Sequence, residues 1–234
     1  MGEIRKAVAA SQSSENTAIL YTSDNGDTCC EHGMWWKSSF YEGSAGILLV
    51  ASWPEHFVSN TEEPAVASLI DVGPTVLDLA SAPPLPDVSG RSFLPFLRGD
   101  RIPDWPHQVF CEYTGLLGDA PSCMVRSERW KLNYYSEYDS CQLFDISADP
   151  GEQNDLVGKA ECAVIVNQLK GRIESRWSAA DVQESLGRHD RTQKVLKNPG
   201  HDPRPHAVAG FMPVPADNTF EFTQLPTRPI GLEG

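Results

Sequence analysis

The feature that most constrains this chain is an apolar strand that runs directly into a group of oxygen donors. Residues 17–23 predict a buried strand, and Asp24 and Asn25 follow it at a turn. Lys37 comes shortly afterwards. Carboxylate and amide oxygens are ligands for a hard divalent cation, and a cation beside a lysine ammonium can hold an anion. The pattern suits a metal and anion site, although Asp-Asn-Gly after a strand is also typical of an ordinary turn.

The composition argues against two broad classes of partner. The net charge is −13 and the pI about 4.8, so the chain repels nucleic-acid backbones and we expect no nucleic-acid partner. No segment approaches the ~20 apolar residues of a membrane span, and residues 1–10 are too polar for a signal peptide. The six cysteines form no CxxC pair, which favours free thiols in a reducing compartment such as the cytoplasm.

Residues 1–107 have the pattern of an α/β domain. We expect a helix over residues 2–10, a second buried strand over 46–53 and an amphipathic helix over 68–80. A helix that leads into a fully apolar strand predicts a parallel α/β unit. The first helix has hardly begun at residue 1, so we expect this region to be the C-terminal part of a catalytic domain truncated at its N-terminus.

Residues 108–177 predict a small subdomain of a different kind. Short β-type runs separated by turns predict an antiparallel sheet, with strands at 108–113, 123–127, 130–135 and 142–146. Residues 160–177 predict an amphipathic helix that packs on this sheet. Residues 178–234 hold many prolines and little periodicity, which predicts an extended tail.

Four segments of the chain, in order, resemble the C-terminal half of a type I sulfatase of the alkaline phosphatase superfamily. The segments are YTSDNGD with EHGMWWK, SSFYEGSAGILLVASWP, SLIDVGPTVLDLASAPPLPDVSGRSFLPFLRG, and MVRSERWKLNYY with QLFDISADPGEQNDL. The nearest likeness is to choline-sulfatase-like and phosphonate monoester hydrolase-like members, and it covers about residues 3–177. The resemblance implies an α/β fold: the C-terminal part of an alkaline-phosphatase-like sandwich, with parallel strands and helices, plus the small antiparallel sheet and its helix.

The resemblance also implies roles for the residues around the first strand end. Asp24 and Asn25 fall where family members ligate a divalent cation, usually calcium. Lys37 falls where a lysine holds sulfate oxygens and assists the leaving group, and His32 is a secondary catalytic candidate. An exposed surface lysine and a plain loop histidine are the alternatives.

Trp35 and Trp36 stand beside Lys37 and could form a wall for the substrate. Core packing is the commoner fate of tryptophan, and it is the alternative for both residues.

The chain departs from the family pattern in lacking a nucleophile. In the family a cysteine in C-x-P-S-R or C-x-P-x-R is converted to formylglycine, and none of the six cysteines here has that setting. The nucleophile would belong to an N-terminal half of the fold, as would the paired aspartates that complete the metal site. We therefore expect this chain to be inactive alone. Its bared strands predict a partner, either that N-terminal half or further copies of the chain.

Three functions follow from these observations. The first is a fragment of a metal-dependent sulfatase that hydrolyses small-molecule sulfate esters. The second is a phosphodiesterase or phosphonate monoester hydrolase of the same superfamily, because sulfate and phosphate share a shape. The third is a non-catalytic remnant that acts as an assembly module and folds without metal.

Overall fold

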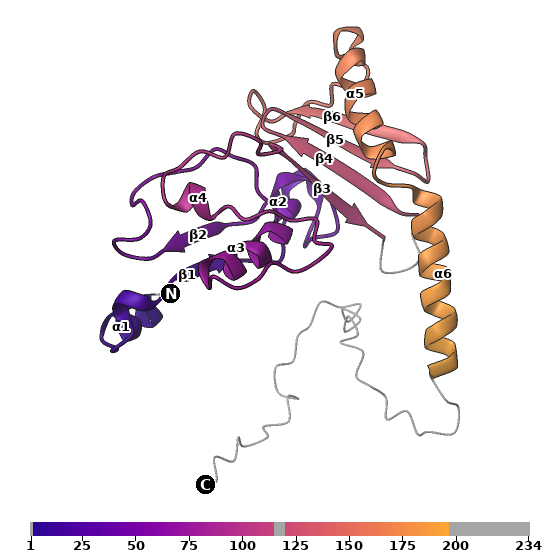
Figure 1. Cartoon of the computed structure of the whole chain (residues 1–234). Helices are drawn as coiled ribbons and strands as arrows, with labels where there is room; N and C mark the ends of the chain where they lie inside the picture. The colour runs from indigo at the N-terminus through magenta and orange to yellow at the C-terminus, as the bar shows by residue number, and fades with distance from the viewer. Residues whose placement is uncertain (1, 115–119, 197–234) are drawn as a thin grey trace, which may run out of the picture. The chain divides into compact units, whose positions relative to one another are not determined.

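The computed structural model describes residues 2–114 and 120–196 (Figure 1). The longer elements are α1 (Gly2–Ala9), β1 (Ile19–Thr22), α2 (Glu42–Ala45), β2 (Leu49–Ser52), α3 (Val72–Leu79), α4 (Leu94–Leu97), β3 (Gln108–Tyr113), β4 (Ser122–Ser127), β5 (Trp130–Tyr135), β6 (Ser140–Asp145), α5 (Ala163–Glu174) and α6 (Ala179–Leu196). Short 3-10 turns are η1 (Ser14–Asn16), η2 (Glu31–Gly33), η3 (Leu69–Asp71) and η4 (Ala160–Cys162).

The chain divides into two compact units, Met1–Gly187 and Arg188–Gly234. The α/β region and the antiparallel sheet thus lie in the same unit. The helix α6 occupies the first part of the segment that the sequence predicts as an extended tail. The remainder of that predicted tail, residues 197–234, lies outside the described residues. Among the described helices, none combines the length and the apolar character needed to cross a membrane.

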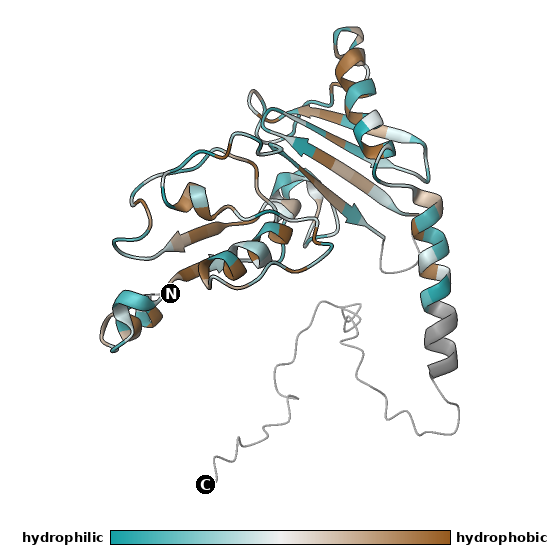
Figure 2. Ribbon diagram, viewed as in Figure 1, coloured by the Kyte–Doolittle hydropathy of each residue, from teal (hydrophilic) through white to brown (hydrophobic). Residues whose placement is uncertain are grey.

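The first two strands form a two-stranded sheet, and they run antiparallel. The parallel unit expected from the sequence is therefore wrong for this pair. Tyr21 lies opposite Val50, and both side chains are 47% exposed. Figure 2 shows hydrophobic colour along β1 and β2. Within the described residues this ribbon has no third strand, although an isolated two-stranded sheet is at best marginally stable.

The helix expected over residues 68–80 is confirmed as η3 followed by α3. Ser68 and Asp71 form a capping box at its start. Thr75 is fully buried; its hydroxyl donates to the Asp71 carbonyl at 2.7 Å and accepts from the Phe93 amide at 3.0 Å. This hydroxyl ties α3 to the segment that leads into α4.

The four-stranded sheet has the order β3-β4-β5-β6, and every neighbouring pair is antiparallel, as the sequence predicts. The helix α5 covers one face (Figure 1). The core on that face consists of Cys123, Val125, Leu132, Leu143, Cys162, Leu169 and Ile173. Ile165 and Trp177 pack against it, so the apolar stripe predicted for this helix is confirmed.

The opposite face of the same sheet is also buried. Lys131 and Asn133 alternate with Leu132 along β5 and are 0% exposed. The segment just before α2 covers this face: the Phe40 ring lies 6.2 Å from the Tyr135 ring, and the Tyr41 ring 5.9 Å from that of Phe144. The small sheet is therefore packed between α5 on one side and the N-terminal region on the other.

Candidate functional site

The predicted cation ligands lie in the loop that follows β1. Asp24 is exposed, and Asn25 is half-buried. The Asn25 amide donates to Oδ1 of Asp24 at 3.0 Å, so the aspartate is held against its own loop. The expected order of strand, aspartate and asparagine is thus present, and the ligand role of both residues stays a prediction.

A buried threonine closes this loop. Thr28 is 0% exposed, its amide and hydroxyl each donate to the Trp36 carbonyl at 2.7 Å, and the hydroxyl also lies 2.9 Å from the Met34 carbonyl. The residue that precedes Lys37 is thereby held beside the segment that follows Asn25. Lys37 itself is exposed, and its catalytic role stays a prediction.

The loop packs directly on the backbone of α2. The Gly26 amide donates to the Ser44 carbonyl at 2.8 Å. A side chain at Gly26 would overlap the Gly43 carbonyl oxygen and would lie 3.0 Å from the carbonyl oxygen of Gly46. Only glycine fits such an approach of two backbones. The position of the loop therefore depends on the position of α2.

The secondary catalytic candidate, His32, has its ring stacked on Tyr41. The two ring centroids are 3.8 Å apart and the planes are 8° from parallel. The stacked His32 ring thus lies beside the N-cap residue of α2, and its catalytic role stays a prediction.

The two tryptophans beside Lys37 are not part of the core in this structure. Trp35 is 67% exposed and Trp36 is 56% exposed. The core-packing alternative is therefore wrong for the described part of the chain. A role as a wall for the substrate stays a prediction.

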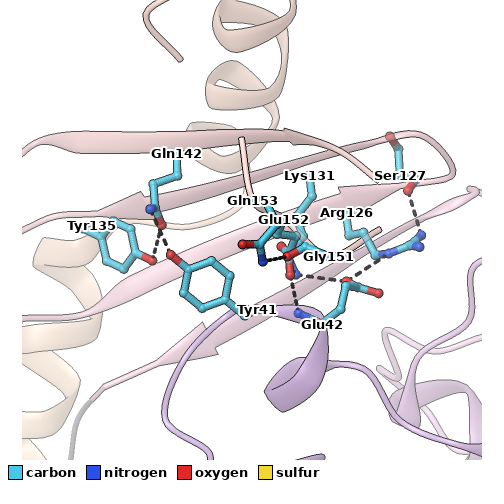
Figure 3. Close-up of polar contacts among 10 residues, drawn as sticks. All are labelled: Tyr41, Glu42, Arg126, Ser127, Lys131, Tyr135, Gln142, Gly151, Glu152 and Gln153. Carbon is cyan, nitrogen blue, oxygen red and sulfur yellow. Dashed lines mark hydrogen bonds and ion pairs between the residues drawn. The ribbon is translucent and has the colours of Figure 1, made fainter. Parts of the chain in front are cut away.

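Among the described residues, four charged side chains join α2 to the small sheet (Figure 3); those of Lys131 and Glu152 are buried, and those of Glu42 and Arg126 are partly exposed. Lys131 is fully buried, and its Nζ lies 3.0 Å from Oε1 of Glu42 and 2.8 Å from Oε1 of Glu152. Arg126 approaches the same Glu42 oxygen at 3.3 Å. Two positive and two negative charges balance, which is the arrangement that buried charges require. We call these four residues the Lys131 cluster.

Sequence reasoning missed this cluster. A lysine is expected on the surface, and nothing in the sequence pairs it with a distant carboxylate. One signal is present in the sequence: Glu42 belongs to the FYEGS segment and Glu152 to the DPGEQ turn, both within the family-like segments. Lys131 alternates with Trp130 and Leu132 and shares its face with Asn133 and Tyr135, a polar pattern that gives no sign of burial.

The donors at Asp24 and Asn25 fit a divalent cation in kind but not in number. A carboxylate and an amide supply hard oxygens, whereas calcium takes about six to eight. Residues 2–114 and 120–196 contain no cluster of three or more His, Cys, Asp or Glu side chains placed to hold a metal ion. The ligand role of Asp24 and Asn25 therefore stays a prediction.

Known proteins match most of this chain. Residues 30–179 match the family model described as N-sulphoglucosamine sulphohydrolase, C-terminal. Arylsulfatase K of Gallus gallus is 38% identical over 171 residues, which are 68% of this chain and 31% of the relative. Arylsulfatase K of Canis lupus familiaris is 35% identical over 83% of this chain and 37% of the relative. The chain thus spans about a third of the length of these relatives.

Solved structures show the same likeness. One, a complex with its substrate D-glucosamine-2-N,6-O-disulfate, has a TM-score of 0.69 and 27% identity, covering 74% of this chain and 36% of that chain. Phosphonate monoester hydrolase of Agrobacterium radiobacter has a TM-score of 0.66 and 23% identity, covering 78% and 38%. These matches confirm the predicted fold class, an α/β part with a small antiparallel sheet and a C-terminal helix.

Proposed function

The chain belongs to the family of N-sulphoglucosamine sulphohydrolase C-terminal domains, and on this premise we propose that it forms the C-terminal part of a metal-dependent sulfatase that hydrolyses small-molecule sulfate esters. One observation carries the proposal. The family match includes Lys37, and the structure folds the segment around Lys37 back onto the loop of Asp24 and Asn25. This arrangement supports a shared site for a cation and an anion.

We assign the residues of this chain as follows. Asp24 and Asn25 contribute two oxygen ligands to a divalent cation, with calcium as the first candidate. When bound, the cation supplies positive charge for the sulfate oxygens. Lys37 holds the same group and neutralises the negative charge on the departing alkoxide. His32, stacked on Tyr41, is the secondary candidate for a proton at the leaving oxygen.

The nucleophile and the remaining ligands come from a second polypeptide region in this proposal. The family's formylglycine setting is absent from the sequence, and a hydrolase needs an attacking group in line with the sulfur. In the described part of the chain β1 and β2 form a two-stranded sheet that bears the exposed apolar pair Tyr21 and Val50, which supports a partner that continues the sheet and covers this pair. The partner we propose is the N-terminal part of a sulfatase; association of further copies of this chain is the alternative outcome.

Co-expression tests this proposal directly. The chain is produced together with the N-terminal region of chicken arylsulfatase K that it does not match, and aryl sulfate hydrolysis is measured with calcium. We expect activity only from the pair and a loss of at least about tenfold with Lys37→Ala, because a transition-state charge loses its partner. Lys170→Ala is the matched control, since this lysine pairs with Asp139 on the surface far along the chain.

The same preparation separates the competing functions. Hydrolysis of a phosphonate monoester in preference to the sulfate would favour the second hydrolase class. A pair that assembles and folds fully with neither hydrolysis nor any calcium effect would support the non-catalytic assembly module and would overturn the sulfatase proposal. Calcium that stabilises the pair but not its Asp24→Ala variant would support the assigned ligands.

A further inference from the structure

We propose that Lys131 and Glu152 are positioning residues for the loop of Asp24, Asn25 and Gly26, and that they act through α2. The loop takes part in catalysis only under the proposed function, so the inference rests on that function. Its structural content, a coupling between two regions far apart in sequence, can be measured independently of any activity.

Lys131 is buried together with its ionic partner Glu152. The Lys131 ammonium is 0% exposed and has carboxylate oxygens at 2.8 Å and 3.0 Å, from Glu152 and Glu42 (Figure 3). The Glu152 side chain is 1% exposed. A buried ammonium is unfavourable unless its partners are held in place. Lys131, fixed on the central strand β5, therefore fixes the positions of both carboxylates.

Glu152 also contacts the start of α2. Oε2 of Glu152 accepts a hydrogen bond from the Glu42 amide at 2.5 Å. That amide is the first of α2, and the N-cap residue Tyr41 makes no side-chain capping bond of its own. The turn after β6 therefore supplies the cap that α2 lacks, across 110 positions of sequence.

The helix α2 in turn contacts the loop of the candidate site. The Gly26 amide donates to the Ser44 carbonyl, and the backbones of Gly26 and Gly43 touch without room for a side chain. Contacts between backbones cannot be absorbed by a change of rotamer. A shift of α2 must therefore move Gly26, and with it the adjoining Asn25 and Asp24.

A second connection to the start of α2 supports the same coupling. The Tyr135 hydroxyl donates to Gln142 at 2.9 Å, and the Gln142 amide donates to the Tyr41 hydroxyl at 3.2 Å (Figure 3). Tyr41 in turn stacks on His32. Burial raises the pKa of Tyr135 to about 12, so its hydroxyl keeps its proton at neutral pH. The polar face of the sheet thus contacts both the start of α2 and the loop beyond it.

Amide hydrogen exchange on the full chain, followed residue by residue by NMR, tests the inference. Glu152→Ala removes the cap on α2. We expect the protection of the Gly26 amide to fall by about tenfold or more, the effect of losing a hydrogen bond to a charged group. Glu152→Gln keeps an oxygen acceptor for the Glu42 amide, and we expect it to restore most of the protection.

Asp155→Ala is the matched control, because this carboxylate accepts the Leu143 amide at 3.0 Å and contacts β6 instead of α2. It should leave Gly26 protected. If Glu152→Ala fails to fold, the double variant Lys131→Met with Glu152→Gln removes the ammonium that anchors residue 152, and we expect Gly26 protection to fall below that of Glu152→Gln alone; equal protection in the two variants would contradict the role of Lys131. Equal loss of protection at Gly26 and throughout β3–β6 would mean a merely structural role and would overturn the inference.

The experiments distinguish failure of the positioning role from failure of the proposed function. Selective loss at Gly26, together with no response of Asp24 or Asn25 to calcium in the co-expressed pair, would keep the positioning role and reject the sulfatase site. Calcium binding to the pair that is unchanged by Glu152→Ala, with Gly26 still protected, would support the sulfatase site and reject the positioning role.

Discussion

Replacement of Gly26 by alanine tests the contact on which the candidate site depends. The added methyl group would overlap the Gly43 carbonyl oxygen, and it would also lie 3.0 Å from the Gly46 carbonyl oxygen. Both obstacles are backbone atoms, so no side-chain rotation can relieve them. The loop and α2 would have to separate by about 1 Å to restore an ordinary C···O distance of roughly 3.3 Å.

The expected cost has two parts. Overpacking costs about 1–3 kcal/mol, and loss of the bond from Gly26 to Ser44 costs about 1 kcal/mol more, so we expect about 2–4 kcal/mol in total. Urea unfolding followed by circular dichroism measures the change as a lower midpoint with an unchanged slope.

Two other glycines provide the comparison. A side chain at Gly43 would approach the end of the flexible Glu31 side chain at 2.7 Å, so Gly43→Ala should cost less than Gly26→Ala. A side chain at Gly158 would meet nothing within 4 Å, and Gly158→Ala should be close to neutral. If Gly26→Ala were as stable as Gly158→Ala, the loop would not lie against α2 and the reasoning would be refuted.

Three further outcomes are expected from the small sheet. Arg129 holds the pKa of Asp145 below its ordinary value, so this pair's stabilisation is fully present above about pH 4 and is lost as the pH falls through the lower folded value. Asp145→Asn should therefore flatten the decline of the unfolding free energy as the pH falls below about 4, and an unchanged decline would contradict the pairing. Leu132 is 0% exposed, and Leu132→Ala should cost about 2–5 kcal/mol in urea unfolding, whereas a cost below 1 kcal/mol would mean the core is loosely packed. Burial raises the pKa of Cys123 to about 12, so iodoacetamide should label the exposed Cys30 in the native chain and leave Cys123 unmodified, as read by peptide mass spectrometry.

The antiparallel sheet could be predicted closely from the sequence. The runs at 108–113 and 130–135 coincide with β3 and β5, because each is a short β-branched or aromatic stretch between clear turns. The direction of β1 relative to β2 could not be predicted in the same way. An apolar run reports burial but does not report which way its neighbour runs, and the antiparallel pairing comes from the path of the chain between the two strands.

The candidate site was predicted only in part. The Asp-Asn-Gly turn and Lys37 stand out as residue types at a strand end, and the structure folds their segments together through Thr28. The family-like segments mark Glu42 and Glu152 individually, but their pairing in the Lys131 cluster could not be predicted, because the two residues are 110 positions apart. Hydrophobic periodicity does not encode a pairing of charges between distant segments.

Successive residues of β5 alternate between two buried faces, one apolar and one polar. Leu132 points to the α5 side, and its neighbours Lys131 and Asn133 point to the side covered by the segment before α2. A saturation scan of this strand should therefore separate into two interleaved classes of tolerance. One class would respond to volume alone, and the other to charge and hydrogen-bonding capacity. Natural substitutions on the polar face could shift the loop of Asp24, Asn25 and Gly26 without any change in the loop's own residues.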